Sequence, residues 1–503
     1  MSQSTWDQLT QYTRETGLLS STLATLGWDE RTGLPPEAIA YRAEQQTYLA
    51  GLIHQRSTAD ELDAWLTELA VSDLGQDPHS DTGATVRLLR RNYDRCAKIP
   101  QTLVEEITRA SVLGQQAWVS ARSNNSFNEF QPHLETLVRL KQQEADAVGY
   151  DQCRYDALLD EFEPGAKAVE VAKVLAELKE SLVPLVQAVG ESANRSPAEI
   201  LHRDYPTDRQ RKIGRRVASK IGFDFRRGRI DETDHPFCTN LGPNDCRITT
   251  RYDEWFFSSA FFGTLHEAGH GLYEQGLRSE FYALPPGQFT SLGIHESQSR
   301  LWENFVGRSA AFWQYFYPMT QDLFPAALSD VTADEFHFAV NDVRPSLIRV
   351  EADEATYNLH IVIRFELEQL LLNGDLSVTD LPDAWNEKYE NLLGIKPSND
   401  AEGVLQDIHW SGGAIGYFPT YSLGNLYAAQ FFAQAALDLG DLDAMFAEGE
   451  FRPLSDWLRT NIHQAGSCYS ASEIVQRVTG QPLSHQPLTD HLYRKLGPLY
   501  GVS

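Results

Sequence analysis

Apolar residues return at helical spacing along most of this 503-residue chain, and that periodicity limits the folds it can adopt. In residues 168–191, AVEVAKVLAELKESLVPLVQAVGE, apolar side chains recur every three or four positions with polar ones between them, as in an amphipathic helix. Residues 134–149 and 359–374 repeat the pattern, and the latter stretch closes on Gly374, a residue type that commonly ends helices. No low-complexity linker or long Gly/Ser tract interrupts residues 1–503. The sequence therefore predicts a single, mainly α-helical domain.

Residues 222–252 depart from this pattern. The stretch GFDFRRGRIDETDHPFCTNLGPNDCRITTRY is rich in Gly, Pro, Asp and Asn and contains short β-prone pieces such as CRITTRY. Such a composition indicates turns joined by a few short strands. Because the stretch directly precedes a pair of histidines, we expect a small β-sheet beside any site that those histidines form.

The charge and the cysteine content limit which partners and which cellular location are possible. Acidic residues outnumber basic ones by 70 to 43, and the formal charge is -27. Nucleic acids and anionic membranes attract positive surface, so neither is an expected partner. No run approaches the ~18 apolar residues of a membrane-spanning helix, and the N-terminus lacks the pattern of a signal peptide.

The five cysteines are odd in number, widely spaced and without C-x-x-C, which is typical of a reducing compartment. We therefore predict a cytoplasmic protein. We interpret Cys238 and Cys246 as packing residues and not as nucleophiles.

The segment HEAGHGLYEQG carries the strongest chemical signal. On a helix, His266 and His270 lie one turn apart on the same face and can direct two imidazoles at one ion. Glu267 follows the first histidine, as in the H-E-x-x-H pattern of zinc hydrolases. The preceding EWFFSSAFFGTL is apolar and aromatic, so the helix is expected to be buried, where unpaired polar groups are costly. A metal ion would satisfy them; the alternative is a hydrogen-bonded pair of core histidines.

A catalytic zinc site needs a third protein ligand. The pattern H-E-x-x-H-x-x-G-x-x-H would supply a histidine, but Tyr273 and Gly276 occupy those later positions. A glutamate from a second helix is the alternative, and Glu296 in SLGIHESQSRLWENF opens a new helical run that could face the first. Glu303, two turns further on, suits a contact with a ligand histidine. The downstream candidates are Glu274, Glu280, Glu296 and Glu303.

This ligand set would support hydrolysis. Zinc held by His266, His270 and Glu296 would lower the pKa of a bound water, which Glu267 would activate by taking its proton and passing it to the leaving nitrogen. The developing oxyanion needs a hydrogen-bond donor. Candidates are His235, His409, Tyr417 and Tyr421, although each could equally be a core or rim residue.

Several motifs together resemble the M32 metallocarboxypeptidases of the thermostable carboxypeptidase type, and the resemblance covers essentially the whole chain. The N-terminal WDERTGLPPEAIAYRAEQQ and the C-terminal PLTDHLYRKLGPLYG are similar to the family as well. Six ordered motifs are more specific than one H-E-x-x-H. They are HPF (235–237), DCRIT (245–249), HEAGH (266–270), HESQ (295–298), IRVEAD (348–353) and GVLQDIHW (403–410).

The resemblance implies a helical gluzincin-type fold with a long substrate groove, a small sheet beside the zinc, and a homodimer. It implies release of single residues from peptide C-termini with broad side-chain tolerance, disfavoured next to proline. It supports Glu296 as the third ligand and Arg349 as the partner of the substrate carboxylate, with Arg247 as a weaker second candidate. A guanidinium can bind a carboxylate through two hydrogen bonds. Without the motif, Arg349 would be expected to form a structural ion pair with Glu351 or Asp353.

Two other functions remain open from the sequence. An oligopeptidase or dipeptidyl carboxypeptidase would share the H-E-x-x-H and distal Glu but release longer products. A metal-stabilised helical scaffold that binds peptides would need no general base at Glu267, and a structural site usually closes all four positions with Cys and His. Cobalt could replace zinc, because both accept this ligand set.

Overall fold

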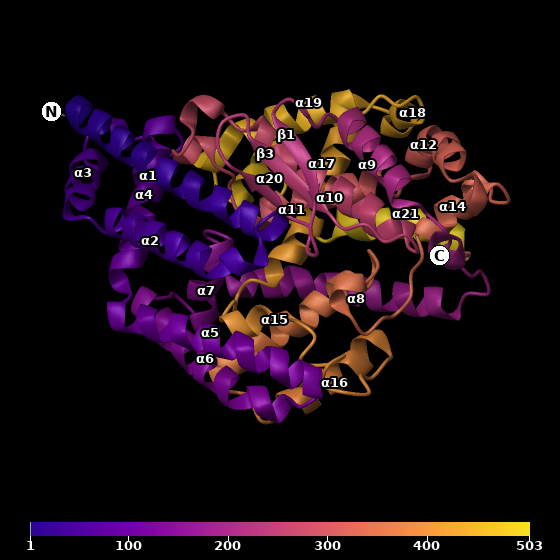
Figure 1. The fold of residues 1–503 in the computed structure, drawn as a ribbon, viewed down its shortest axis with the longest axis horizontal. Helices are drawn as coiled ribbons and strands as arrows, with labels where there is room; N and C mark the ends of the chain where they lie inside the picture. Colours follow the sequence, from indigo (N-terminus) through magenta and orange to yellow (C-terminus); the bar gives the residue numbers. More distant parts are fainter. Residues whose placement is uncertain (1, 503) are drawn as a thin grey trace. The chain divides into compact units, whose positions relative to one another are not determined.

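The computed structural model describes residues 2–502 and is dominated by α-helices, as predicted (Figure 1). The amphipathic stretch at 168–191 is helix α8 (Ala168–Glu191). The stretch at 359–374 lies in α15 (Tyr357–Asn373), which is capped by Gly374 at φ 79°. Within the described part of the chain, no helix is both long and apolar enough to cross a membrane.

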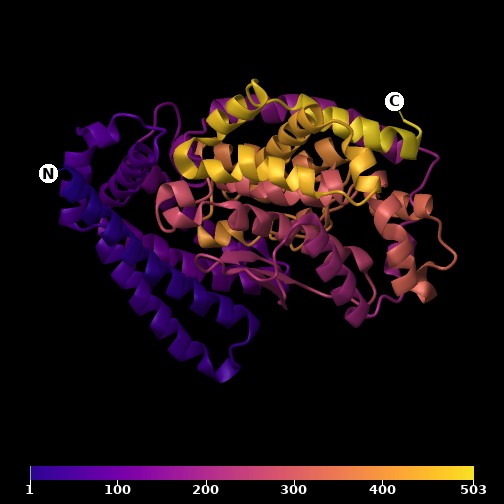
Figure 2. The same cartoon turned by 90° about the horizontal axis from the view of Figure 1, so that it is seen from above.

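The chain folds into two compact units, each built from three separate stretches. The first unit contains the stretch up to Ala97, Pro197–Val340 and Phe431–Pro482. Its helices α1 and α2 lie side by side in both views (Figures 1 and 2). The helices of this unit are α1 (Ser2–Thr32), α2 (Ile39–Ser57), α3 (Asp60–Ala70), α4 (Asp81–Lys98), α9 (Thr207–Ile221), α10 (Phe257–Gly276), α11 (Leu292–Arg300), α12 (Ala310–Leu323), α13 (Pro325–Leu328), α14 (Ala333–Val340), α18 (Leu442–Ala447), α19 (Arg452–Asn461) and α20 (Ala471–Thr479).

The second unit contains Lys98–Ser196, Asn341–Gln430 and the stretch from Leu483. Helix α17 (Pro419–Leu439) has residues in both units, and α4 extends into the second unit by its last residue, Lys98. Besides α8 and α15, the helices of this unit are α5 (Gln101–Asn124), α6 (Phe127–Val148), α7 (Arg154–Phe162), α16 (Leu381–Leu393) and α21 (Gln486–Tyr500).

The predicted small sheet lies in the first unit. Strands β1 (Gly228–Glu232), β2 (Cys238–Asn240) and β3 (Cys246–Thr250) are arranged in the order β1-β3-β2. The central strand β3 pairs in parallel with β1 and antiparallel with β2. Both β2 and β3 pack against α10, so the sheet adjoins the helix that carries the two histidines (Figure 1).

An aromatic cluster holds the first turns of α10 in the core. Phe257 stacks on Phe261 at 5.0 Å between ring centroids, and Phe261 contacts Trp313 of α12 at 5.1 Å. Phe257 also meets Phe336 of α14 edge to face at 5.4 Å. Burying such large rings is strongly stabilising. The apolar segment before the histidines therefore fixes α10 inside the unit, as its composition predicted.

Candidate metal centre

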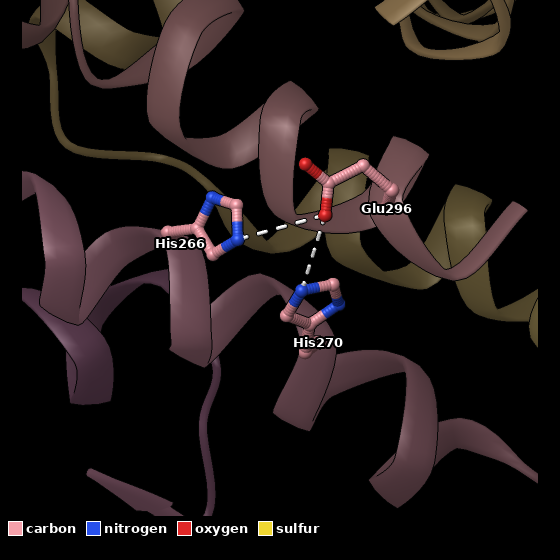
Figure 3. Close-up of side chains that lie close together, drawn as sticks. All are labelled: His266, His270 and Glu296. Carbon is pink, nitrogen blue, oxygen red and sulfur yellow. Dashed lines mark ion pairs between the residues drawn. The ribbon is translucent and has the colours of Figure 1, made fainter. Parts of the chain in front are cut away.

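Helices α10 and α11 bring two imidazoles and one carboxylate together. His266 and His270 lie one turn apart on α10, and Glu296 faces them from α11 (Figure 3). The two helices approach closely because Gly269 has no side chain. A Cβ at Gly269 would lie 2.5 Å from the carbonyl oxygen of Gln298 and 2.6 Å from the Cα of Ser299. The glycine inside the HEAGH motif thus determines how near Glu296 comes to the histidines.

The ligand atoms are spaced as a zinc ion requires. The Oε2 atom of Glu296 lies 3.6 Å from Nε2 of His266 and 3.5 Å from Nε2 of His270. Ligand bonds of ~2.0–2.2 Å at tetrahedral angles separate neighbouring donor atoms by about 3.4 Å. Two histidines and a carboxylate are also an established donor set for catalytic zinc. Within the described residues, these three form the one group of His, Cys, Asp or Glu side chains able to hold a metal. The residues present therefore fit a metal ion.

The other ring nitrogens of the histidines are held by hydrogen bonds. Nδ1 of His266 lies 2.9 Å from Oε2 of Glu303, and Nδ1 of His270 lies 3.0 Å from the carbonyl oxygen of His295. Both acceptors require a proton on Nδ1, so each Nε2 presents its lone pair toward Glu296. Glu303, expected to contact a ligand histidine, lies in a single π-helical turn at Leu301–Val306. Such turns are rare and frequently occur at functional sites.

Arg300 links the two carboxylates of this centre. Its Nε donates to Oε1 of Glu296 at 2.7 Å, and its Nη1 donates to Oε2 of Glu303 at 3.3 Å. Burial alone would raise the pKa of both carboxyls, but Arg300 and His266 outweigh it. The pKa of Glu296 is held well below its usual range and that of Glu303 is lowered to about 2. Sequence reasoning missed Arg300, although its spacing of four residues from Glu296 was an available signal.

Glu267 is buried beside this group and incompletely paired. Its side chain is 6% exposed, and its Oε2 has no hydrogen-bond partner among the described residues. Burial raises the pKa of Glu267 to about 7, despite the opposing effect of His266. Burial also lowers the pKa of His270 to about 3, with a further contribution from the neighbouring His295. A buried carboxyl with an unused oxygen is suited to exchange a proton with a bound reactant.

The other candidate third ligands are placed elsewhere. Glu274 accepts from Nε2 of His295 at 2.9 Å and from the side-chain amide of Asn240 at 2.8 Å. The ring of His295 in turn stacks on His270 with centroids 4.4 Å apart. Glu280 lies in a short 3₁₀ turn, Ser279–Phe281, outside the metal group. Glu274 therefore contacts the centre through His295, which supports the ring of His270.

The sequence model described as Carboxypeptidase Taq (M32) metallopeptidase matches residues 8–496. The chain belongs to this family. Thermostable carboxypeptidase 1 of Thermus thermophilus is 47% identical over 99% of each chain, and Carboxypeptidase 1 of Bacillus subtilis is 40% identical over 96% of each. Residues 8–496 include every motif on which the resemblance was based, apart from the last five residues of PLTDHLYRKLGPLYG.

Solved structures agree with this membership. The crystal structure of an M32 carboxypeptidase from Deinococcus radiodurans superposes with a TM-score of 0.96 at 43% identity, covering 99% of this chain and all of the other. A Pyrococcus furiosus carboxypeptidase structure gives a TM-score of 0.93 at 34% identity, covering 98% of each chain. This M32 chain is therefore a metallocarboxypeptidase, an enzyme that hydrolyses peptides from the C-terminus with a metal.

In the second unit of the M32 enzyme, Arg349 is buried and oriented by two neighbours. Its Nε and Nη2 donate to Oδ1 of Asp407 at 3.0 and 2.7 Å, and its Nη1 donates to the hydroxyl of Tyr357 at 2.8 Å. The expected alternative partners, Glu351 and Asp353, are not the ones it uses. Asp353 instead accepts from the backbone and hydroxyl of Thr356. Asp407 also pairs with Arg364 at 2.6 Å, and the pKa of Asp407 lies far below its usual range because both arginines outweigh its burial.

Three of the candidate oxyanion donors gather near Arg349. Nε2 of His409 lies 3.3 Å from the hydroxyl of Tyr421, and the rings of Tyr417 and Tyr421 meet edge to face at 5.3 Å. The guanidinium of Arg349 lies 5.0 Å from the ring centroid of Tyr421. Burial lowers the pKa of His409 to about 4, so this histidine is neutral near pH 7. The second unit thus assembles a cation and several hydrogen-bonding rings in one place.

The remaining two candidates lie in the first unit. His235 is exposed in the segment between β1 and β2. Arg247 on β3 donates through Nε and Nη2 to Asp245, both at 2.8 Å, and its guanidinium lies 4.4 Å from the ring of Trp28 on α1. These contacts hold the Arg247 side chain between the sheet and α1.

Proposed function

We propose that this enzyme releases single residues from the C-termini of peptides, with zinc held by His266, His270 and Glu296 and with Glu267 as the general base. The observation that carries the proposal is the metal centre itself. Its three donor atoms are spaced for one ion, and a buried carboxyl with an unused oxygen follows the first ligand. A purely structural metal site would gain nothing from that carboxyl.

Each residue has a defined task in this proposal. A zinc ion in the site supplies Lewis-acid polarisation and makes a water acidic near neutral pH. Glu267 takes the proton of the attacking water and returns it to the leaving nitrogen, a role that suits a buried carboxyl with an unused oxygen. Glu303 and the His295 carbonyl keep the protons of the two imidazoles on Nδ1 throughout. His235, His409, Tyr417 and Tyr421 are the candidate donors to the oxyanion.

Arg349 is proposed to bind the substrate's terminal carboxylate. Three of its five N–H groups are used by Asp407 and Tyr357, which fix the plane of the guanidinium. A guanidinium held in this way can donate hydrogen bonds to a carboxylate, and little further side-chain entropy is lost on binding. The motif match at residues 348–353 supports this role, with Arg247 as the weaker alternative.

Broader properties follow from family membership as proposals. They are wide tolerance of the released side chain, poor release next to proline, a homodimer and a long substrate groove. Cobalt as a substitute metal is proposed from the donor set, and a cytoplasmic location is proposed from the cysteine content. Sedimentation of the purified protein would test the dimer directly.

Mass spectrometry of peptide products would test the activity. A free-acid peptide and its C-terminal amide are each incubated with zinc-loaded protein and with protein treated with a chelator. We expect a ladder of single-residue losses from the free acid that needs the metal and is absent for the amide. Dipeptide steps or internal cuts would instead indicate the oligopeptidase, and intact peptides with metal bound would indicate the scaffold.

A further inference from the structure

Two cysteines lie within reach of each other on neighbouring strands of the sheet. Cys238 is on β2 and Cys246 on β3, and their sulfur atoms are 3.7 Å apart. In the register of this hairpin, Cys238 pairs with Ile248 and Cys246 pairs with Asn240, so the two cysteines are diagonal neighbours. Residues at such positions point to the same face of a sheet. Here that face is the one packed on α10, because the sulfur of Cys246 lies 3.8 Å from the Gly271 carbonyl oxygen.

The fold allows the remaining approach of the two sulfurs. A disulfide needs a separation of ~2.05 Å, so the sulfur atoms must close by about 1.7 Å. Cys246 is fixed in the central strand, but β2 has three residues and forms the edge of the sheet. An edge strand has a partner on one side only and can shift more easily than a central one. Cys238 is half-buried while Cys246 is 3% exposed, so Cys238 is the more accessible residue of the two.

We propose that Cys238 and Cys246 form a dithiol site that is oxidised reversibly to a disulfide by small peroxides. The Cys238 sulfur attacks one oxygen of hydrogen peroxide, the O–O bond breaks and one water leaves, which gives a sulfenic acid on Cys238. The Cys246 sulfur then attacks the Cys238 sulfur, the S–O bond breaks and a second water leaves. The two thiols together lose two electrons and two protons, and the peroxide is reduced to two waters.

The surroundings make the first step slow near neutral pH. The hydrogen bond with Cys246 and burial raise the pKa of the Cys238 thiol well above its usual range, and Glu274 and Glu267 add to this effect. The thiolate is the reactive form, so the rate of oxidation should rise with pH. Once formed, the disulfide would tie the edge strand to β3 directly against the helix that carries His266 and His270.

Peptide mapping of the full-length protein would test the site. No lysine or arginine lies between the two cysteines, so trypsin leaves both on one peptide, residues 230–247. After treatment with hydrogen peroxide and alkylation, we expect this peptide to lose two hydrogens, about 2 Da, and to escape alkylation until dithiothreitol is added. The number of free thiols in the protein should fall from five to three.

Matched variants separate the pair from the other thiols. Cys246→Ser should prevent the 2 Da loss and let Cys238 proceed to the sulfinic acid, a gain of two oxygens, because no second thiol intercepts it. Cys96→Ser, which removes an exposed cysteine elsewhere, should leave the crosslink unchanged. The proposal is overturned if the 230–247 peptide of the wild type gains oxygen without forming the crosslink, or stays reduced while other cysteines are oxidised.

Discussion

Replacing Gly269 by alanine would force α10 and α11 apart. The new methyl carbon would lie 2.5 Å from the carbonyl oxygen of Gln298, against about 3.5 Å for an unstrained contact. The obstacle is backbone, which cannot rotate away as a side chain can. The helices must therefore separate by about 1 Å. If α11 takes the whole shift, Oε2 of Glu296 moves from 3.5 Å to about 4.5 Å from Nε2 of His270, beyond the ~3.4 Å of a tetrahedral site.

Gly269→Ala is expected to lower both the stability of the fold and the affinity for zinc, and the two effects are measured separately. Overpacking of a buried contact typically destabilises a fold by about 1–3 kcal/mol, offset here by roughly 1 kcal/mol because alanine favours helix over glycine. Misplacing a ligand should weaken zinc binding by at least the ~10–100-fold seen when supporting contacts are lost. Thermal unfolding of metal-free protein reports the first part, and zinc titration against a chromophoric chelator reports the second.

Gly263→Ala is the matched control on the same helix. The nearest atom to its new methyl carbon would be Oγ1 of Thr250 at 3.7 Å, an ordinary contact. This variant should bind zinc normally and be as stable as the wild type or up to about 1 kcal/mol more stable. Wild-type zinc affinity in Gly269→Ala would refute the argument that this glycine determines the position of Glu296.

Four further changes have definite expected outcomes. Glu267→Gln should retain zinc by metal analysis but lose at least ~10²-fold in kcat, and full turnover would exclude a general-base role. Glu303→Gln should lower zinc affinity by ~10–100-fold in the same chelator titration, because His266 loses a charged acceptor. Arg349→Ala should reduce kcat/KM for free-acid peptides much more than for C-terminal amides, and an equal loss on both would make it structural. Glu368 on α15 is fully buried, and burial raises its pKa to about 7, so near neutral pH the folded protein holds a proton that the unfolded chain has released. The free energy of unfolding should thus decrease as the pH rises from about 4.5 to about 7, with at most about 3 kcal/mol of the decrease due to Glu368. In urea unfolding experiments, the free energy of unfolding of Glu368→Gln should depend less on pH than that of the wild type.

Local patterns predicted the elements well, because periodicity and turn composition are local properties. The helix at 168–191 and the strands within 222–252 lie where the sequence placed them. Residues paired across the fold were harder to find. Arg349 binds Asp407, 58 residues away, where nearby Glu351 or Asp353 had seemed the natural structural partners. No spacing rule reaches that far along a chain.

In the metal centre too, neighbouring residues were easier to predict from the sequence than residues brought together by the fold. H-E-x-x-H gives the two histidines and Glu267 from one helix turn. Glu296 had to be chosen among four glutamates by its place at the start of the next helical run, a choice that the family motifs supported. The π-helical turn that carries Glu303 has no sequence signature that we could use. The role of Gly269 appears only when the two helices are seen together, because a glycine inside a helix otherwise reads as a weak point.

Helix α10 contains four glycines, at positions 263, 269, 271 and 276, within twenty residues. Each glycine destabilises a helix by roughly 1 kcal/mol relative to alanine, so the isolated segment has little tendency to form a helix by itself. A newly made chain would therefore have no preformed pair of histidines to capture an ion. Metal loading should come after the aromatic core has closed around α10, so the folded apoprotein, rather than a metal-nucleated fragment, should be the species that takes up the ion.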